Sequence, residues 1–132
     1  MGGQIGRKGP WSLATVFALF PILKDKRRQG SASLSGGQQQ MAAIGRALMS
    51  NPDLLMLDEL SLGLAPIVIR DIYELLPRIT GHGLTVMLVE QDVTRALASA
   101  NRFICLQKGR VSLEGMPQQH TREAITRAYF GT

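Results

Sequence analysis

The sequence has few of the residues that build disulfide frameworks and metal centres. It contains one cysteine, Cys105, and two histidines, His82 and His120. A single cysteine excludes an intramolecular disulfide, and its place in the apolar run 103–106 favours burial as a small hydrophobic residue. Both histidines stand in loop-like contexts with no partner at ligand spacing, so we expect no metal cluster built on histidine and cysteine.

Long apolar runs are also missing. None reaches the length of a membrane-spanning helix. The stretch from Trp11 to Leu23 follows Arg7 and Lys8 and imitates a secretory signal peptide, but the basic residues at 24–28 oppose export and no small-x-small cleavage site follows. A length of 132 residues with 45% apolar content predicts one soluble globular unit with a modest core.

The net charge of +5 is confined to one end of the chain. Residues 1–30 carry six basic side chains and one acid, whereas the remainder holds nine of each. Because the body of the chain is neutral, the charge does not form the broad basic surface typical of nucleic-acid binding, and we expect no nucleic-acid partner. Residues 1–14, rich in glycine and basic side chains, are predicted to form an irregular arm.

Apolar periodicity and breaking residues predict helices alternating with strands. The expected helices are 15–23 interrupted at Pro21, from just after Ser35 to about Ser50, from Pro66 with a kink or an end at Pro77, from Asp92 through Ala100, and 122–129. The expected strands are 54–57, 84–89, and a hairpin of 103–106 with 111–113. This order predicts an α/β fold of parallel strands flanked by helices, with a short C-terminal hairpin and helix. The unbroken apolar run 54–57 predicts a strand buried on both faces.

Acidic residues close both apolar strands. Asp58 and Glu59 follow the first strand, and Glu90 follows the second. Ligands of open parallel sheets bind at the carboxyl ends of the strands. A carboxylate there can hold Mg²⁺, and an adjacent one can orient or deprotonate an attacking water. On its own the pattern also fits acids that simply leave a strand for solvent.

A glycine pair stands one helix upstream of these acids, in the string Leu34-Ser35-Gly36-Gly37-Gln38. Ser35 followed three residues later by Gln38 is a capping-box pattern. The two glycines leave backbone N–H groups uncovered at a helix N-terminus, where the helix dipole favours an anion such as a phosphate. The same five residues in this order are the signature motif of ABC-type ATPases.

From about residue 16 to its C-terminus, the chain resembles the ATP-binding subunits of ABC transporters, and most of all those of branched-chain amino acid importers. The strings that carry the resemblance are LSGGQQQM (34–41), AIGRALM (43–49), LDELSLGLAP (57–66), LVEQD (88–92) and RAYFG (127–131). The resemblance implies the C-terminal part of a P-loop NTPase domain. Residues 15–132 would then be a partial nucleotide-binding domain, running from the end of the helical subdomain to the C-terminal helix.

The resemblance also implies roles for single residues. Asp58 would be the Walker B magnesium ligand, Glu59 the catalytic carboxylate, and residues 61–64 the D-loop that meets a partner subunit. Ser35 to Gln38 would contact the γ-phosphate of ATP bound by that partner. Gln91 stands in place of the switch-loop histidine, as is common in the amino acid importer branch, and would share the catalytic role.

Three departures from the family pattern accompany these matches. Leu60 stands where proline usually follows the Walker B glutamate, and Pro77 has no obvious precedent. The largest departure is the phosphate loop, G-x-x-x-x-G-K-[ST], because none of the fourteen glycines is followed by lysine. The resemblance therefore implies that Asp58 and Glu59 lack the nucleotide they would serve, while residues 35–38 could serve a partner's nucleotide.

The implied cofactors are ATP and Mg²⁺. The implied partners are a second ABC ATPase subunit, in a homo- or heterodimer, and membrane permease subunits that hold the chain at the inner, cytoplasmic face of the cell membrane. The first hypothesis is an energy-coupling subunit, complete or truncated, of an importer for leucine, isoleucine and valine, with amides or urea open as solutes. Two alternatives remain open: a non-catalytic module that pairs with an intact ABC ATPase, and a truncated product with no independent role. We do not expect the chain to hydrolyse ATP alone, and we expect exposed apolar surface along 54–57 and 84–89.

Overall fold

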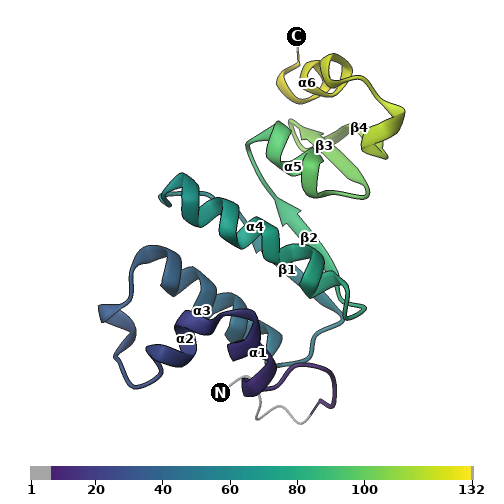
Figure 1. Cartoon of the computed structure of the whole chain (residues 1–132). Coiled ribbons are helices and arrows are strands. Elements are labelled where there is room, and N and C mark those ends of the chain that lie inside the picture. The colour runs from purple at the N-terminus through teal and green to yellow at the C-terminus, as the bar shows by residue number, and fades with distance from the viewer. Residues whose placement is uncertain (1–6, 132) are drawn as a thin grey trace. The chain divides into compact units, whose positions relative to one another are not determined.

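The computed structural model describes residues 7–131, in which helices alternate with strands (Figure 1). The chain divides after Val89 into two units. The first holds α1 (Leu13–Leu19), α2 (Pro21–Asp25), α3 (Gly36–Leu48), β1 (Leu54–Asp58), α4 (Pro66–Thr80) and β2 (Thr85–Val89). The second holds α5 (Val93–Ser99), β3 (Phe103–Gln107), β4 (Arg110–Gly115) and α6 (Arg122–Phe130). Short 3-10 helices occur at Ser31–Ser33 and Pro117–Gln119. Gly2, Gly3 and Gly6 of the expected arm lie outside the described residues.

Helix starts fall where capping residues predict them. At α3 the Ser35 Oγ accepts the N–H of Gln38 at 3.3 Å, and the Gln38 Oε1 accepts the N–H of Ser35 at 3.1 Å, which completes the capping box. Asp92 Oδ1 accepts the N–H of Arg95 at 3.0 Å and caps α5. Proline occupies the first turn of α2 and of α4, where a missing N–H costs nothing. The helix starts predicted at Ser35, Pro66 and Asp92 are confirmed.

β1 and β2 form a two-stranded parallel sheet, as the order of elements predicts. The inner face of this sheet carries Leu55 and Leu57, which join a core with buried residues of α1, α3 and α4. Leu48 of α3 is fully buried in this core. Figure 1 shows α4 running across both strands, so this helix forms the layer that covers the inner face. Burial of apolar surface between helix and sheet is the main source of stability for the unit.

The opposite side of the sheet, which we call the outer face, carries Asp58, Thr85 and four apolar residues, Leu54, Met56, Met87 and Val89. Each of these four apolar residues exposes between 46% and 66% of its surface. The prediction that 54–57 is a strand buried on both faces is therefore wrong, because residues of β1 alternate between exposed and buried. The described residues supply helices to one face only. The prediction of exposed apolar surface along both strands is confirmed.

Pro77 lies inside α4 and does not end it, so of the predicted kink or end the end is wrong. The helix continues to Thr80, and the N–H of Gly81 donates to the Pro77 carbonyl at 2.9 Å. Proline removes one backbone donor and disfavours a helical residue before it. The apolar face of α4 nevertheless packs into the core on both sides of the proline, through Ile69, Ile72, Leu76 and Ile79. Tertiary packing overrides the local preference.

The N-terminal arm packs against the loop that precedes β1. The Asn51 side chain accepts the N–H of Trp11 at 2.8 Å and donates to the carbonyls of Arg7, at 3.2 Å, and of Trp11, at 3.1 Å. Trp11 is only 5% exposed, and its ring meets the ring of His82 edge-on at 4.8 Å. Residues 13 and 14 already belong to α1. The described part of the arm, expected to be irregular, is thus held by specific contacts and ends in a helix.

The second unit is a hairpin with one helix packed on it. β3 and β4 pair antiparallel, as predicted. Lys108 and Gly109 link them with φ values of 48° and 76°, the left-handed pair that a two-residue hairpin turn requires. Ser112 of β4 donates through its hydroxyl to the Ala128 carbonyl of α6 at 2.9 Å. Ile125 of α6 is buried, which fixes the helix on the hairpin.

Cys105 of β3 is buried, as its apolar neighbours predict. Burial raises the pKa of its thiol, because the thiolate would lose solvation. In the second unit His120 contacts the ring of Phe103 edge-on at 5.4 Å. Within residues 7–131 no helix is long and apolar enough to cross a bilayer.

α3 and α4 approach each other closely where α3 begins. A Cβ atom on Gly37 would lie 2.3 Å from Cγ1 of Val68, whereas one on Gly36 would lie 3.5 Å from Cδ2 of Leu64. The first distance is far below van der Waals contact, and the second is an ordinary contact. The close packing of α3 on α4 therefore requires glycine at position 37 and leaves room for a methyl group at position 36.

Replacing Asn51 by glycine should release the arm. Glycine keeps the positive φ of 49° at this position but removes the three hydrogen bonds to Arg7 and Trp11. We expect a loss of about 1–3 kcal/mol in the free energy of unfolding. Because Trp11 is the single tryptophan, its fluorescence emission should shift to the red. Asp53→Asn, which breaks only the exposed ion pair with Arg7, is the control and should leave the emission unchanged. An unshifted spectrum for Asn51→Gly would show that Asn51 does not hold the arm.

Gly37→Ala and Gly36→Ala should differ in stability. The first variant should lose about 1–3 kcal/mol, because the new methyl group meets Val68 in a packed interface. The second should be neutral or slightly more stable, since alanine favours a helix over glycine. Urea denaturation of both variants measures the difference, and Val68→Ala in the Gly37→Ala background should recover part of the loss. Equal stability of the two glycine variants would contradict the close approach of α3 and α4.

Candidate functional site

The candidate residues occupy three places in the chain. Residues 35–38 begin α3, residues 58–64 form the end of β1 and the turn after it, and residues 90–92 connect β2 to α5. The first two places belong to the first unit, and the third opens the second unit.

The start of α3 offers two backbone donors. The capping box uses the N–H of Gln38, and the N–H of Gln39 donates to the Ser35 carbonyl at 2.8 Å. The N–H groups of Gly36 and Gly37 meet no acceptor within residues 7–131. Ser35 and Gly36 are exposed to solvent. Two such donors at the positive end of a helix dipole suit an anion. The Oε1 of Gln38 accepts a hydrogen bond in the cap, which leaves the NH2 of this side chain as a further donor at this end.

The turn after β1 is fixed by main-chain hydrogen bonds. Asp58 closes the strand, pairs with Val89 of β2 and is exposed. Glu59 follows with a φ of 47°, in the left-handed region that residues other than glycine adopt at a cost. Its N–H donates to the Val89 carbonyl at 2.9 Å, and its own carbonyl accepts the N–H of Leu62 at 3.1 Å. These two bonds hold the strained turn and place two consecutive carboxylates at the carboxyl end of the sheet.

The donor set of this turn fits an open magnesium site. Mg²⁺ binds one or two carboxylates, keeps several waters and takes its remaining ligands from substrate phosphates. Asp58 supplies one such carboxylate where parallel sheets bind ligands. In the part of the chain that the structure describes, no three His, Cys, Asp or Glu side chains gather into a group that could hold a metal. The residues present therefore suit an ion shared with a nucleotide phosphate rather than one enclosed by protein.

The turn after β1 also lies beside the start of α3. Leu60, which stands where the family usually has proline, is 2% exposed and anchors the turn in the core. Gly63 has a φ of +74°, and the chain then turns so that Leu64 faces Gly36 while Val68 faces Gly37. The structure thus brings Leu64, the last residue of the segment 61–64, next to Gly36. Sequence reasoning missed the contacts of Leu64 and Val68 with the start of α3, because such contacts leave no local pattern.

The loop at the start of the second unit is organised by Glu90. Its Oε1 accepts the N–H of Gln91 at 3.0 Å and the N–H of Asp92 at 3.2 Å. Asp92 also pairs with Arg95 at 3.3 Å while it caps α5. Gln91 is exposed. Sequence reasoning placed Glu90 only as an acid that closes a strand, and its role in shaping the loop around Gln91 emerges from the structure.

Comparison with known proteins finds relatives of one kind. The family model described as ABC transporter matches residues 11–61. The High-affinity branched-chain amino acid transport ATP-binding protein BraG of Pseudomonas aeruginosa is 49% identical over 113 residues, which are 84% of this chain and 48% of BraG. The Aliphatic sulfonates import ATP-binding protein SsuB of Pseudomonas fluorescens is 39% identical over 112 residues, which are 83% of this chain and 42% of SsuB.

Solved structures share the fold. The ADP conformation of MJ1267, an ATP-binding cassette of an ABC transporter, matches with a TM-score of 0.68 and 26% identity over 93% of this chain and 52% of its own. A nucleotide-free ATP-binding cassette from an ABC transporter matches with a TM-score of 0.72 and 25% identity over 90% of this chain and 50% of its own. The chain spans about half the length of the proteins it matches. On this evidence the chain belongs to the family of ABC transporter ATP-binding proteins.

Proposed function

We propose that the chain provides the signature, Walker B and D-loop part of the ATP-binding subunit of a branched-chain amino acid importer. The observation that carries the proposal is the start of α3, where the N–H groups of exposed Gly36 and buried Gly37 meet no acceptor within residues 7–131. Such an end suits the γ-phosphate of ATP. The 49% identity with BraG supports branched-chain amino acids as the solutes, with leucine, isoleucine and valine expected.

Each candidate residue has a role in this proposal. Mg²⁺, when bound, neutralises charge on the phosphates. Asp58 would hold the ion, and Glu59 would orient the attacking water and accept its proton. Gln91 would contact the γ-phosphate through its side-chain amide, in place of the usual histidine. Ser35 and the glycine pair would contact the γ-phosphate of a nucleotide bound by the partner subunit.

The nucleotide itself must be anchored from outside this sequence. No glycine in the chain is followed by lysine, so the lysine that reaches the β- and γ-phosphates is lacking. We therefore propose a composite site in which the start of α3 serves ATP held by a second ATP-binding subunit. The partners would include that subunit and permease subunits, through which the chain would lie at the inner face of the membrane. By itself the chain would not hydrolyse ATP.

A second candidate function is suggested by the presence of the signature motif without a phosphate-loop sequence. The capping box of α3 is complete, whereas the phosphate-loop sequence is missing from residues 1–132. These two observations also fit a non-catalytic module that pairs with an intact ABC ATPase. The two candidates differ in whether Asp58 and Glu59 ever meet a nucleotide, since only the first requires a phosphate loop beside them.

The signature role can be tested by rescue. A full-length ABC ATP-binding subunit whose own signature serine is replaced by arginine keeps its phosphate loop and should lose ATP hydrolysis. Addition of this chain should restore hydrolysis, because Ser35 to Gln38 would complete the composite site. The Ser35→Arg variant should fail by roughly a hundredfold, since arginine blocks the donors that stabilise the developing charge.

Ser33→Arg provides the matched control for this rescue. Ser33 is exposed and lies two residues before the cap, so its replacement should leave the rescue intact. Steady-state release of inorganic phosphate measures all three mixtures. Rescue that survives Ser35→Arg, or no rescue by the unmodified chain, would contradict the proposed role. Micromolar ATP affinity of the chain alone would contradict the need for a partner.

A further inference from the structure

The helix α1 is apolar on the side that faces solvent as well as on the side that faces the core. Val16 and Leu19 are 3% and 5% exposed and belong to the core. Leu13, by contrast, exposes 56% of its surface, and Ala14 and Ala18 are also exposed. None of the seven residues of α1 is charged. A surface helix normally carries polar residues on its solvent side, so the exposed side of α1 is suited to a contact.

The exposed side of α1 lines an open groove. The groove has a volume of about 570 Å³ and is lined by Leu13, Ala14, Phe17, Ala18 and Lys24. Four of these five side chains are apolar. The fifth, a lysine of α2, can extend its aliphatic stem along an apolar surface while its ammonium group stays in water. The groove therefore suits a partner that presents an apolar layer with anionic groups at its edge.

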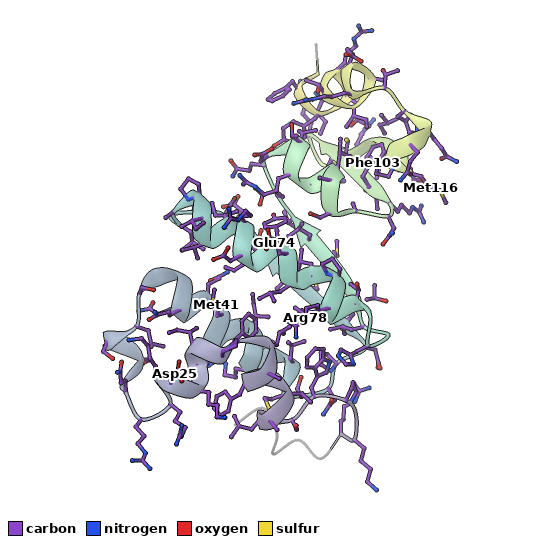
Figure 2. The ribbon with its side chains drawn as sticks, viewed as in Figure 1. Asp25, Met41, Glu74, Arg78, Phe103 and Met116 are labelled. Atoms are coloured by element: carbon purple, nitrogen blue, oxygen red, sulfur yellow. The ribbon has the colours of Figure 1, made fainter. Side chains whose placement is uncertain are left out.

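A basic segment begins at this groove. Residues 24–28 carry four cations and one acid, Asp25, which Figure 2 labels on α2. Lys24, Arg27 and Arg28 are exposed. Within residues 7–131 no ion pair involves any of the four cations. The positive charge of the segment is therefore available to an anionic partner.

We propose that the groove of α1 and the basic segment 24–28 form a docking surface for a bilayer that contains anionic lipids. Apolar side chains of an interfacial helix enter the boundary between headgroups and acyl chains, and nearby lysine and arginine side chains meet the lipid phosphates. A protein partner fits less well, because Lys24 is the one polar side chain that the groove offers for fixing its orientation. A fluid lipid layer needs no fixed orientation.

This contact with lipid goes beyond the proposed function. There the chain would lie at the membrane through permease subunits, whereas the docking surface would meet the bilayer directly. Anionic lipids give a membrane surface a negative potential that attracts basic segments. The apolar groove supplies the second contribution, since a basic segment combined with buried apolar area binds a bilayer more strongly than either alone.

Flotation with lipid vesicles tests the docking surface without nucleotide or permease. The chain is mixed with phosphatidylcholine vesicles, with or without phosphatidylglycerol, and centrifuged in a density gradient in which vesicle-bound protein rises. The bound fraction should be on the order of tenfold lower with the neutral vesicles, because each cation near an anionic surface adds to the affinity. Aggregated chain stays at the bottom of the gradient, so it does not count as bound.

The apolar contribution is tested at the first turn of α1. Leu13→Asp places a charge in the groove and should lower flotation on the order of tenfold. Ile67→Asp is its matched control: Ile67 is 53% exposed and stands, like Leu13, in the first turn of a helix that has no acid there. Because the helix dipole favours an acid at both positions, both variants should fold, which circular dichroism checks. The control should float like the unmodified chain.

The basic contribution is tested by charge reversal. Lys24→Glu combined with Arg28→Glu should abolish flotation, because the segment then carries more acids than cations. Lys108→Glu combined with Arg110→Glu is the control, since it makes the same change in net charge at two exposed residues of the turn between β3 and β4. This control should keep the flotation with anionic vesicles.

The pattern of flotation decides between the possible partners. Flotation that requires phosphatidylglycerol, is lost with Leu13→Asp and with the Lys24 and Arg28 reversal, and is kept in both controls would support the docking surface. Equal flotation with neutral vesicles, or flotation that survives Leu13→Asp, would overturn it. Absence of flotation would also overturn it, and binding of a synthetic helix of glutamate and leucine instead would assign the surface to an acidic protein. A failure here would leave the proposed signature role standing, since the assay contains no ATP.

Discussion

The close approach of α3 and α4 at Gly37 and Val68 is the contact on which the arrangement of the first unit depends. It sets the position of the start of α3 relative to the first turn of α4. Leu64, which precedes that turn, lies beside Gly36, so the end of the segment 61–64 and the start of α3 are neighbours. A side chain at position 37 would push α3 and α4 apart, and it would therefore shift both the start of α3 and the segment before α4. The position of the backbone donors relative to the turn after β1 thus depends on the close packing of Gly37 against Val68.

Features with local causes could be predicted from the sequence. The capping box of α3 and the cap of α5 are hydrogen bonds between residues three apart, and the residue types alone indicate them. The tight turn between β3 and β4 likewise depends on the residues at 108 and 109. Features with distant causes could not be predicted. Pro77 stays helical because the core holds α4 on both sides of it, and Trp11 is buried by contacts with residues 40 or more positions away.

The candidate site divides in the same way. Ser35 to Gln38, Asp58, Glu59 and Gln91 stand out by residue type, order and family resemblance, and their roles remain predictions. The roles of Glu90 and Val68 could not be predicted from the sequence. Glu90 accepts hydrogen bonds from the main chain of its neighbours, and Val68 acts through a contact between two helices. The exposed side of the β1–β2 sheet shows the limit most clearly. An unbroken apolar run indicates a strand with two buried faces, but it does not say which polypeptide covers the second one.

The capping box of α3 has a consequence for how an anion would be recognised. With the Gln38 Oε1 committed to the cap, the groups left at this end are peptide N–H groups, a serine hydroxyl and the side-chain NH2 of Gln38. None of these changes its charge in the physiological pH range, in contrast to a histidine ligand. The charge of this half-site would therefore stay constant as pH changes, and only the titration of the phosphate itself would alter the attraction. Discrimination between anions would depend on their shape and charge, because the N–H groups at the start of α3 have fixed positions.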